Sequence, residues 1–174
     1  MELRMNLHHW EHREPDWAAA AVSGFAAGAI LMVLELAWAT LSGSSGPWRI
    51  SQLVAALTLG VGPLQGSPFS FDPVIVGMAL ATHYLLGVAF GMVLGYVLAG
   101  YRYDSSVTPM LLIGAAFGLF LYLINFHALT HVFPWLTELQ GWTTLTAHLV
   151  FGISAALLYW KLARRRVEPQ TGRR

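Results

Sequence analysis

Four long, nearly uncharged apolar runs restrict what this chain can fold into more than any other feature. Only 11% of the residues are charged, whereas a soluble domain has roughly 25%. A helix crosses the hydrocarbon core of a bilayer with roughly 20 apolar residues, and backbone groups in lipid must be satisfied within the segment. Because the alternation of a membrane barrel strand is absent, we expect an all-α integral membrane protein with four transmembrane helices in a bundle. The predicted spans are Trp17–Leu41, Asp72–Gly100, Thr108–Val132 and Trp142–Leu162.

The loop after the first span, Ser42–Phe71, has a helical segment of its own. Within Pro47–Gly60, apolar residues recur at roughly helical spacing and are interrupted by Arg49 and Gln52. A short amphipathic segment of this kind is typical of an interfacial helix. We therefore expect one interfacial helix in the first outer loop.

The distribution of basic residues predicts the orientation in the membrane. Of the 10 Lys and Arg residues, all but Arg49 lie in the two terminal flanks or in the link 101–107. Loops rich in Lys and Arg stay on the cytoplasmic side. We expect a cytoplasmic tail at 1–16, a transmembrane domain at 17–164 and a cytoplasmic basic tail at 165–174, and the family resemblance given below implies that the membrane is the bacterial inner membrane.

Composition also excludes several kinds of chemistry. The chain has no cysteine, so disulfides, thiolate metal sites, iron–sulfur clusters and Cys-attached haem are excluded. Its net charge is +1, and no basic patch is interleaved with stacking aromatics, so we expect no nucleic-acid partner. No Ser-His-Asp order, phosphate loop or dinucleotide fingerprint is present, which indicates no enzymatic activity of the chain on its own.

Each predicted span contains one ionisable residue well inside it. Glu35 lies in the first span, and His83, His127 and His148 lie in the other three. Such residues are costly in lipid and by default mark a functional site. His83 lies four residues before Gly87, and His148 and Glu35 have similar spacings to glycines of their own spans, which predicts that these three face inward. Counted at 1.5 Å per residue, Glu35 is about 9 Å from the outer end of its span.

This set of side chains predicts a metal or haem site. Carboxylates and imidazoles from facing helices build such sites in bundle cores, and without thiols the donors suit Zn, Cu or Fe. Two imidazoles from different helices are alternatively axial ligands of haem b. We expect the haem ligands among His83, His127 and His148, and the protein to be an accessory subunit of a membrane redox complex. The candidate metal ligands are Glu35, His83, His127, His131 and His148.

Two other interpretations remain open. Chains of Glu and His within membranes also serve as proton or ion paths. Alternatively, Glu35 pairs with a histidine, and the polar contacts hold the helices in register at about 1 kcal/mol each. The protein is then a structural subunit or scaffold without a site.

One family resemblance involves the same residues. The stretch Thr146–Val150, followed by the basic cluster Arg164–Arg166, resembles the last span of YagU-like bacterial inner-membrane proteins. The resemblance implies a Glu in the first span and a His in the second and third spans, which correspond here to Glu35, His83 and His127. It implies no catalytic activity.

Small residues four apart predict where the chain meets its partners. Gly114 and Gly118 lie on one side of the third span, and His127 and His131 on another. If the histidine side turns inward, the glycine side is free to dock a helix of another chain. We therefore expect lipid contact, and self-association or binding of another membrane subunit through Gly114 and Gly118.

Overall fold

The protein is an all-α bundle. The computed structural model describes residues 14–42, 46–100 and 107–167. Four helices, or helical segments, are long and apolar enough to cross a membrane: Trp17–Ser42, Pro73–Ala99, Val107–His131 and Trp142–Ala163. The predicted fold class is therefore confirmed. In chain order the elements are α1 (Trp17–Ser42), α2 (Arg49–Leu59), η1 (Gly62–Gln65), α3 (Pro73–Ala99), α4 (Val107–Leu123), η2 (Ile124–Ala128), η3 (Leu129–His131), η4 (Pro134–Leu139) and α5 (Trp142–Val167).

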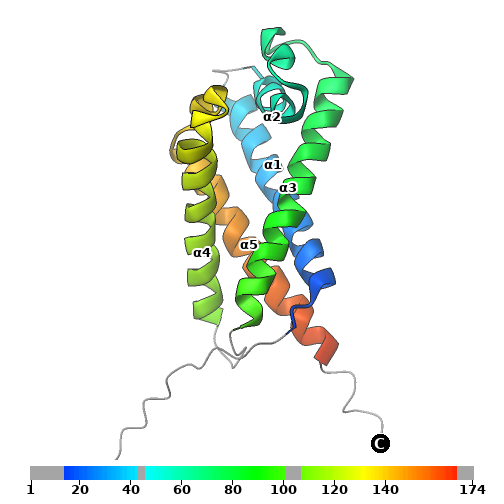
Figure 1. Cartoon of the computed structure of the whole chain (residues 1–174), viewed down its shortest axis with the longest axis vertical. Coiled ribbons are helices and arrows are strands. Elements are labelled where there is room, and N and C mark those ends of the chain that lie inside the picture. Colours follow the sequence, from blue (N-terminus) through cyan, green and yellow to red (C-terminus); the bar gives the residue numbers. More distant parts are fainter. Residues whose placement is uncertain (1–13, 43–45, 101–106, 168–174) are drawn as a thin grey trace, which may run out of the picture.

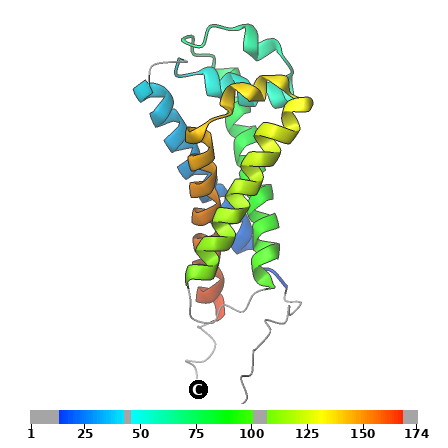
Figure 2. The same ribbon diagram turned by 90° about the vertical axis from the view of Figure 1, so that its left-hand side faces the viewer.

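The four long helices run side by side, and the short elements gather at one end of the bundle, here called the α2 end (Figures 1 and 2). α1 packs against α3 and α5, and α5 packs against α4, whereas α3 and α4 contact each other little. The first residue of α1 and the last residue of α5 both lie at the opposite end (Figure 1). The placement of both termini on one side of the membrane stays a prediction, because the termini themselves lie outside the described residues. The described residues do not determine which side these ends occupy, and most of each predicted tail, 1–16 and 165–174, lies outside them.

Two glycine crossings bring the helix backbones together. At the crossing of α1 and α3, a Cβ atom on Gly24 would lie 2.8 Å from Gly91 Cα. At the crossing of α4 and α5, a Cβ atom on Gly114 would lie 2.9 Å from Ile153 Cα, and one on Gly118 would collide with the carbonyl oxygen of His148. Both distances leave no room for a side chain, as expected where small residues let helices approach closely.

The second crossing corrects the predicted docking surface. Gly114 and Gly118 were expected to contact another chain, but both are buried against α5 of the same chain. The physical reason is that Gly152 and Ala156 form a matching small-residue face on α5. α4 therefore turns its glycine side inward, and His127 is exposed on the outside.

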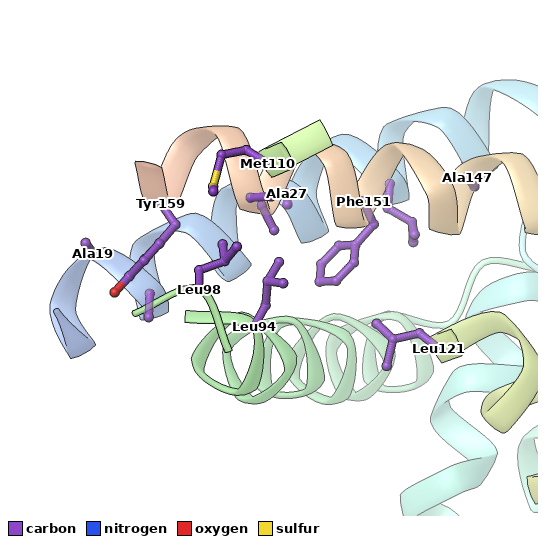
Figure 3. Close-up of a cluster of buried hydrophobic side chains, with 13 residues drawn as sticks. Ala19, Ala27, Leu94, Leu98, Met110, Leu121, Ala147, Phe151 and Tyr159 are labelled. Carbon is purple, nitrogen blue, oxygen red and sulfur yellow. The ribbon is translucent and has the colours of Figure 1, made fainter. Parts of the chain in front are cut away.

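The interior away from the α2 end is apolar (Figure 3). Leu94 and Leu98 of α3 meet Phe151 of α5 and Ala27 of α1 in one buried cluster. Leu94 and Leu98 are almost completely buried. This cluster runs along the interior of the bundle, from Ala147 near the α2 end to Tyr159 near the opposite end (Figure 3).

The predicted interfacial helix is present as α2, but it belongs to the protein body. Leu53, Ala55 and Ala56 are buried, and α2 packs against α3. The Gln52 amide donates to Ser67 O at 3.1 Å, and the indole of Trp135 donates to Leu53 O at 3.3 Å. These bonds hold α2 across the end of the bundle, where it covers the ends of the long helices. This covering helix, Arg49–Leu59, is here called the roof.

Candidate functional site

Glu35 lies beneath this roof, where α1 passes between two cavities. Its carboxyl group is half-buried, and it forms no hydrogen bond or ion pair with any residue that the structure describes. Both cavities are lined by Glu35, and α2 contributes to the wall of each. A half-buried carboxyl group that lines two cavities and has no partner is the most unusual polar feature of the described bundle.

The larger cavity, here called the α5 cavity, lies between α1 and α5 and has a volume of about 450 Å³. Most of the exposed wall surface is apolar and includes two tryptophans, but eight of the sixteen lining residues are polar or charged. Its lining residues are Leu34, Glu35, Trp38, Ala39 and Ser42 of α1, Arg49, Ile50 and Leu53 of α2, Glu138 and Leu139 of η4, Gln140, and Trp142, Thr143, Thr144, Thr146 and Ala147 of α5.

The smaller cavity, here called the α3 cavity, lies between α1 and α3 and has a volume of about 150 Å³. Glu35 and His83 both line it. The other lining residues are Met32, Leu36, Pro47, Trp48, Ile50, Ser51, Val54, Val76, Ala79 and Leu80.

His83 is held in one orientation by the glycine crossing. Its Nε2 atom lies 2.8 Å from Gly28 O. A carbonyl oxygen can only accept a hydrogen bond, so Nε2 carries the proton and donates. In the neutral ring the remaining nitrogen, Nδ1, then carries a free lone pair. A Cβ atom on Gly28 would lie 3.6 Å from Nε2, which is an ordinary van der Waals distance, so the hydrogen bond does not itself require a glycine there.

His148 is also fixed by a hydrogen bond to a backbone carbonyl, but through Nδ1 instead of Nε2. Its Nδ1 donates to Thr144 O at 2.9 Å, one turn back along α5. The ring is buried, with its centroid 5.1 Å from that of Phe126 and 6.4 Å from that of Tyr122. His148 lines neither the α5 cavity nor the α3 cavity.

His127 and His131 are exposed at the irregular end of the third span. The span is predicted as one continuous helix, but from Ile124 it continues as a π-helix and then as a 3₁₀-helix. The Gln140 amide donates to Phe126 O, and the Tyr122 hydroxyl accepts from Gly141 N at 3.1 Å. Because the helix type changes between the two histidines, their spacing of four does not place them one turn apart on an α-helix.

The structure therefore brings together two of the five candidate ligands. Glu35 and His83 share the α3 cavity, whereas His127, His131 and His148 lie elsewhere. Among the described residues, no three His, Asp or Glu side chains are close enough to hold one metal ion. Neither cavity is lined by two imidazoles.

Sequence analysis missed the ion pair that closes the α5 cavity. Arg49 of α2 bonds both carboxylate oxygens of Glu138, with Nε to Oε2 at 2.9 Å and Nη2 to Oε1 at 2.6 Å. The hydrogen bond with Glu138 raises the pKa of Arg49 above its ordinary value, and the carboxylate charge acts in the same direction. The only sign of this ion pair in the sequence is that the first outer loop holds one basic residue and the second holds one acidic residue.

We expect the substitution Glu138→Gln to loosen this roof without unfolding the bundle. The amide cannot replace a charge-assisted, two-pronged contact, but Glu138 is 46% exposed, so the loss of stability is about 1 kcal/mol or less. Hydrogen exchange in α2 should become faster, while exchange in α5 should not change. Glu14→Gln removes an exposed carboxylate at the opposite end and is the control; equal exchange in α2 of both variants would contradict the prediction.

Comparison with known proteins adds no functional assignment, because the chain matches no protein-family model, no curated protein and no solved structure at a significant level. The function is therefore argued from the two cavities and the residues that line them.

Proposed function

We propose that this protein is an integral membrane protein that binds a cation at Glu35. The observation that carries the proposal is the Glu35 carboxyl group, which faces two cavities and has no partner among the described residues. A carboxylate in a site of low dielectric is costly unless an opposite charge accompanies it. A bound cation supplies that charge.

The charges around the α5 cavity support a positively charged ligand. Arg49 and Glu138 also line the cavity, but they neutralise each other. With the three groups ionised, the cavity carries one net negative charge, which belongs to Glu35. This charge attracts a cation, and the attraction is stronger beside the apolar wall than it would be in bulk water.

A transition-metal ion is the first cation to consider, because Glu35 and His83 line one cavity. The Nε2–H of His83 donates to a backbone carbonyl, an arrangement that orients the ring of many metal-ligating histidines. A carboxylate and an imidazole suit Zn, Cu or Fe, with water completing the coordination. If the ion is Cu or Fe, the protein has the role of an accessory subunit of a membrane redox complex. Haem b has less support, because neither cavity is lined by two imidazoles.

The arrangement favours binding at one end of the bundle over conduction through it. Between the cavities and the opposite end lie the glycine crossing of α1 with α3 and the apolar cluster of Leu94, Leu98 and Phe151. The positions of Lys and Arg support an orientation in which the α2 end faces outward.

Titration of purified protein with Zn²⁺ tests this function against the alternative of a structural subunit. The histidines at positions 8, 9 and 12 lie outside the described residues, so they are replaced with alanine to remove their own metal binding. Calorimetry is expected to show one Zn²⁺ per chain. The absence of a site for Zn²⁺, Cu²⁺ or Fe²⁺, together with no binding of organic cations, would favour the structural alternative.

A further inference from the structure

We infer that the α5 cavity binds an organic ammonium ion that has an apolar body. This inference rests on the proposed cation site and names a second class of ligand for it. The ammonium group lies against the Glu35 carboxylate, and the apolar body lies between α1 and α5. The ligand is recognised by its charge and its aromatic contacts, whether it is a free amine or the choline group of a lipid.

The size and wall of the α5 cavity fit such a ligand better than a bare ion. Its volume of about 450 Å³ is within the range of sites for small organic molecules. Such sites are mostly apolar with a few convergent polar groups, and here Leu34 and Ala147 line the wall with the carboxyl group of Glu35.

Two tryptophans supply the second feature of an ammonium site. Trp38 of α1 and Trp142 of α5 line the same cavity from opposite walls. An indole face attracts an organic cation by about 0.5–2 kcal/mol, with the larger value when water is excluded. Both side chains are also exposed at the bundle surface, at 55% and 82%, so the cavity is accessible to an amphipathic molecule from the side.

Binding of benzyltrimethylammonium tests this inference. Calorimetry is performed on the full chain in phosphatidylglycerol nanodiscs, which contain no choline. We expect saturable binding, with affinity reduced at least about tenfold by Glu35→Gln and by Thr143→Trp. Thr143 is exposed and lines the α5 cavity, so the larger side chain fills the cavity without disturbing the core. An uncharged isostere should compete at least about tenfold less well.

A matched variant separates this inference from the metal site. Leu80 lines the α3 cavity and not the α5 cavity, so Leu80→Trp should weaken Zn²⁺ binding and leave ammonium binding unchanged. Ammonium binding that is absent, or insensitive to Glu35→Gln or Thr143→Trp, would overturn the inference. Zn²⁺ binding that still depends on Glu35 would then leave the proposed function in place, whereas loss of both would overturn both.

A comparison of two further lipids shows whether the ammonium group belongs to a lipid headgroup or to a free organic cation. Lower apparent affinity in phosphatidylcholine nanodiscs than in nanodiscs of an uncharged glycolipid without choline identifies the lipid headgroup as a competing occupant and supports the site, because neither lipid concentrates the cation at the surface by net charge. Equal affinity in the two lipids supports a free organic cation at the same site.

Discussion

Replacing Gly24 with leucine is expected to prevent assembly of the bundle. A Cβ atom at this position would lie 2.8 Å from Gly91 Cα and would also collide with Gly87 O. These atoms belong to the backbone of α3 and cannot move aside as a flexible side chain can. Because overpacking a well-packed contact costs about 1–3 kcal/mol and occasionally more, and a whole leucine side chain must be accommodated, we expect a loss at or above the top of that range. Yield of monodisperse protein and thermal unfolding measure it.

Gly77 provides the matched control for this substitution. It lies on the same helix pair, in α3, but nothing is within 4 Å of a Cβ atom built on it. Gly77→Leu should therefore behave like the unsubstituted protein. We expect Gly118→Leu to destabilise the crossing of α4 with α5 for the same reason that Gly24→Leu destabilises the crossing of α1 with α3. An unfolding temperature of Gly24→Leu equal to that of Gly77→Leu would contradict the packing of α1 on α3.

Replacing Glu35 with glutamine is expected to abolish Zn²⁺ binding while preserving the fold. At an effective dielectric constant of about 20, a unit charge 4 Å away contributes roughly 4 kcal/mol. Loss of the carboxylate should therefore weaken Zn²⁺ binding by at least about 100-fold. In the absence of added ion the variant should be at least as stable as the unsubstituted protein, because the described residues offer the carboxyl group no bond that could be lost and the amide removes an unpaired charge.

Glu138→Gln is the control for removal of a carboxylate at the same end of the bundle. Glu138 is already neutralised by Arg49, so Zn²⁺ affinity should change by no more than about threefold. If Glu35→Gln kept the affinity for Zn²⁺ but lowered the unfolding temperature, Glu35 would have a structural role, and the site proposal would fail.

The four spans were predictable because length and hydropathy alone select them. The last residues of the first span and the first residues of the second differ by only one position from the helices Trp17–Ser42 and Pro73–Ala99. The spacing of His83 from Gly87 likewise placed this histidine on the inward face of α3. These inferences depend on periodicity within one segment, which the sequence contains in full.

The remaining features depend on contacts between segments. The partner of Gly114 and Gly118 was predicted wrongly because the choice between α5 and another chain depends on how all the helices fit together. The Gln140 amide donates to Phe126 O within the π-helix that begins at Ile124. The ion pair of Arg49 with Glu138 joins α2 to η4. Neither pairing leaves a local pattern in the sequence.

Anomalous diffraction from crystals grown with Zn²⁺ tests the cation site most directly. The protein used lacks the histidines at positions 8, 9 and 12. The proposed function predicts one anomalous peak in the α3 cavity, bounded by the Glu35 carboxylate and by Nδ1 of His83, and no peak there in Glu35→Gln. A zinc peak at His127 or His131 with none beside Glu35 would contradict it.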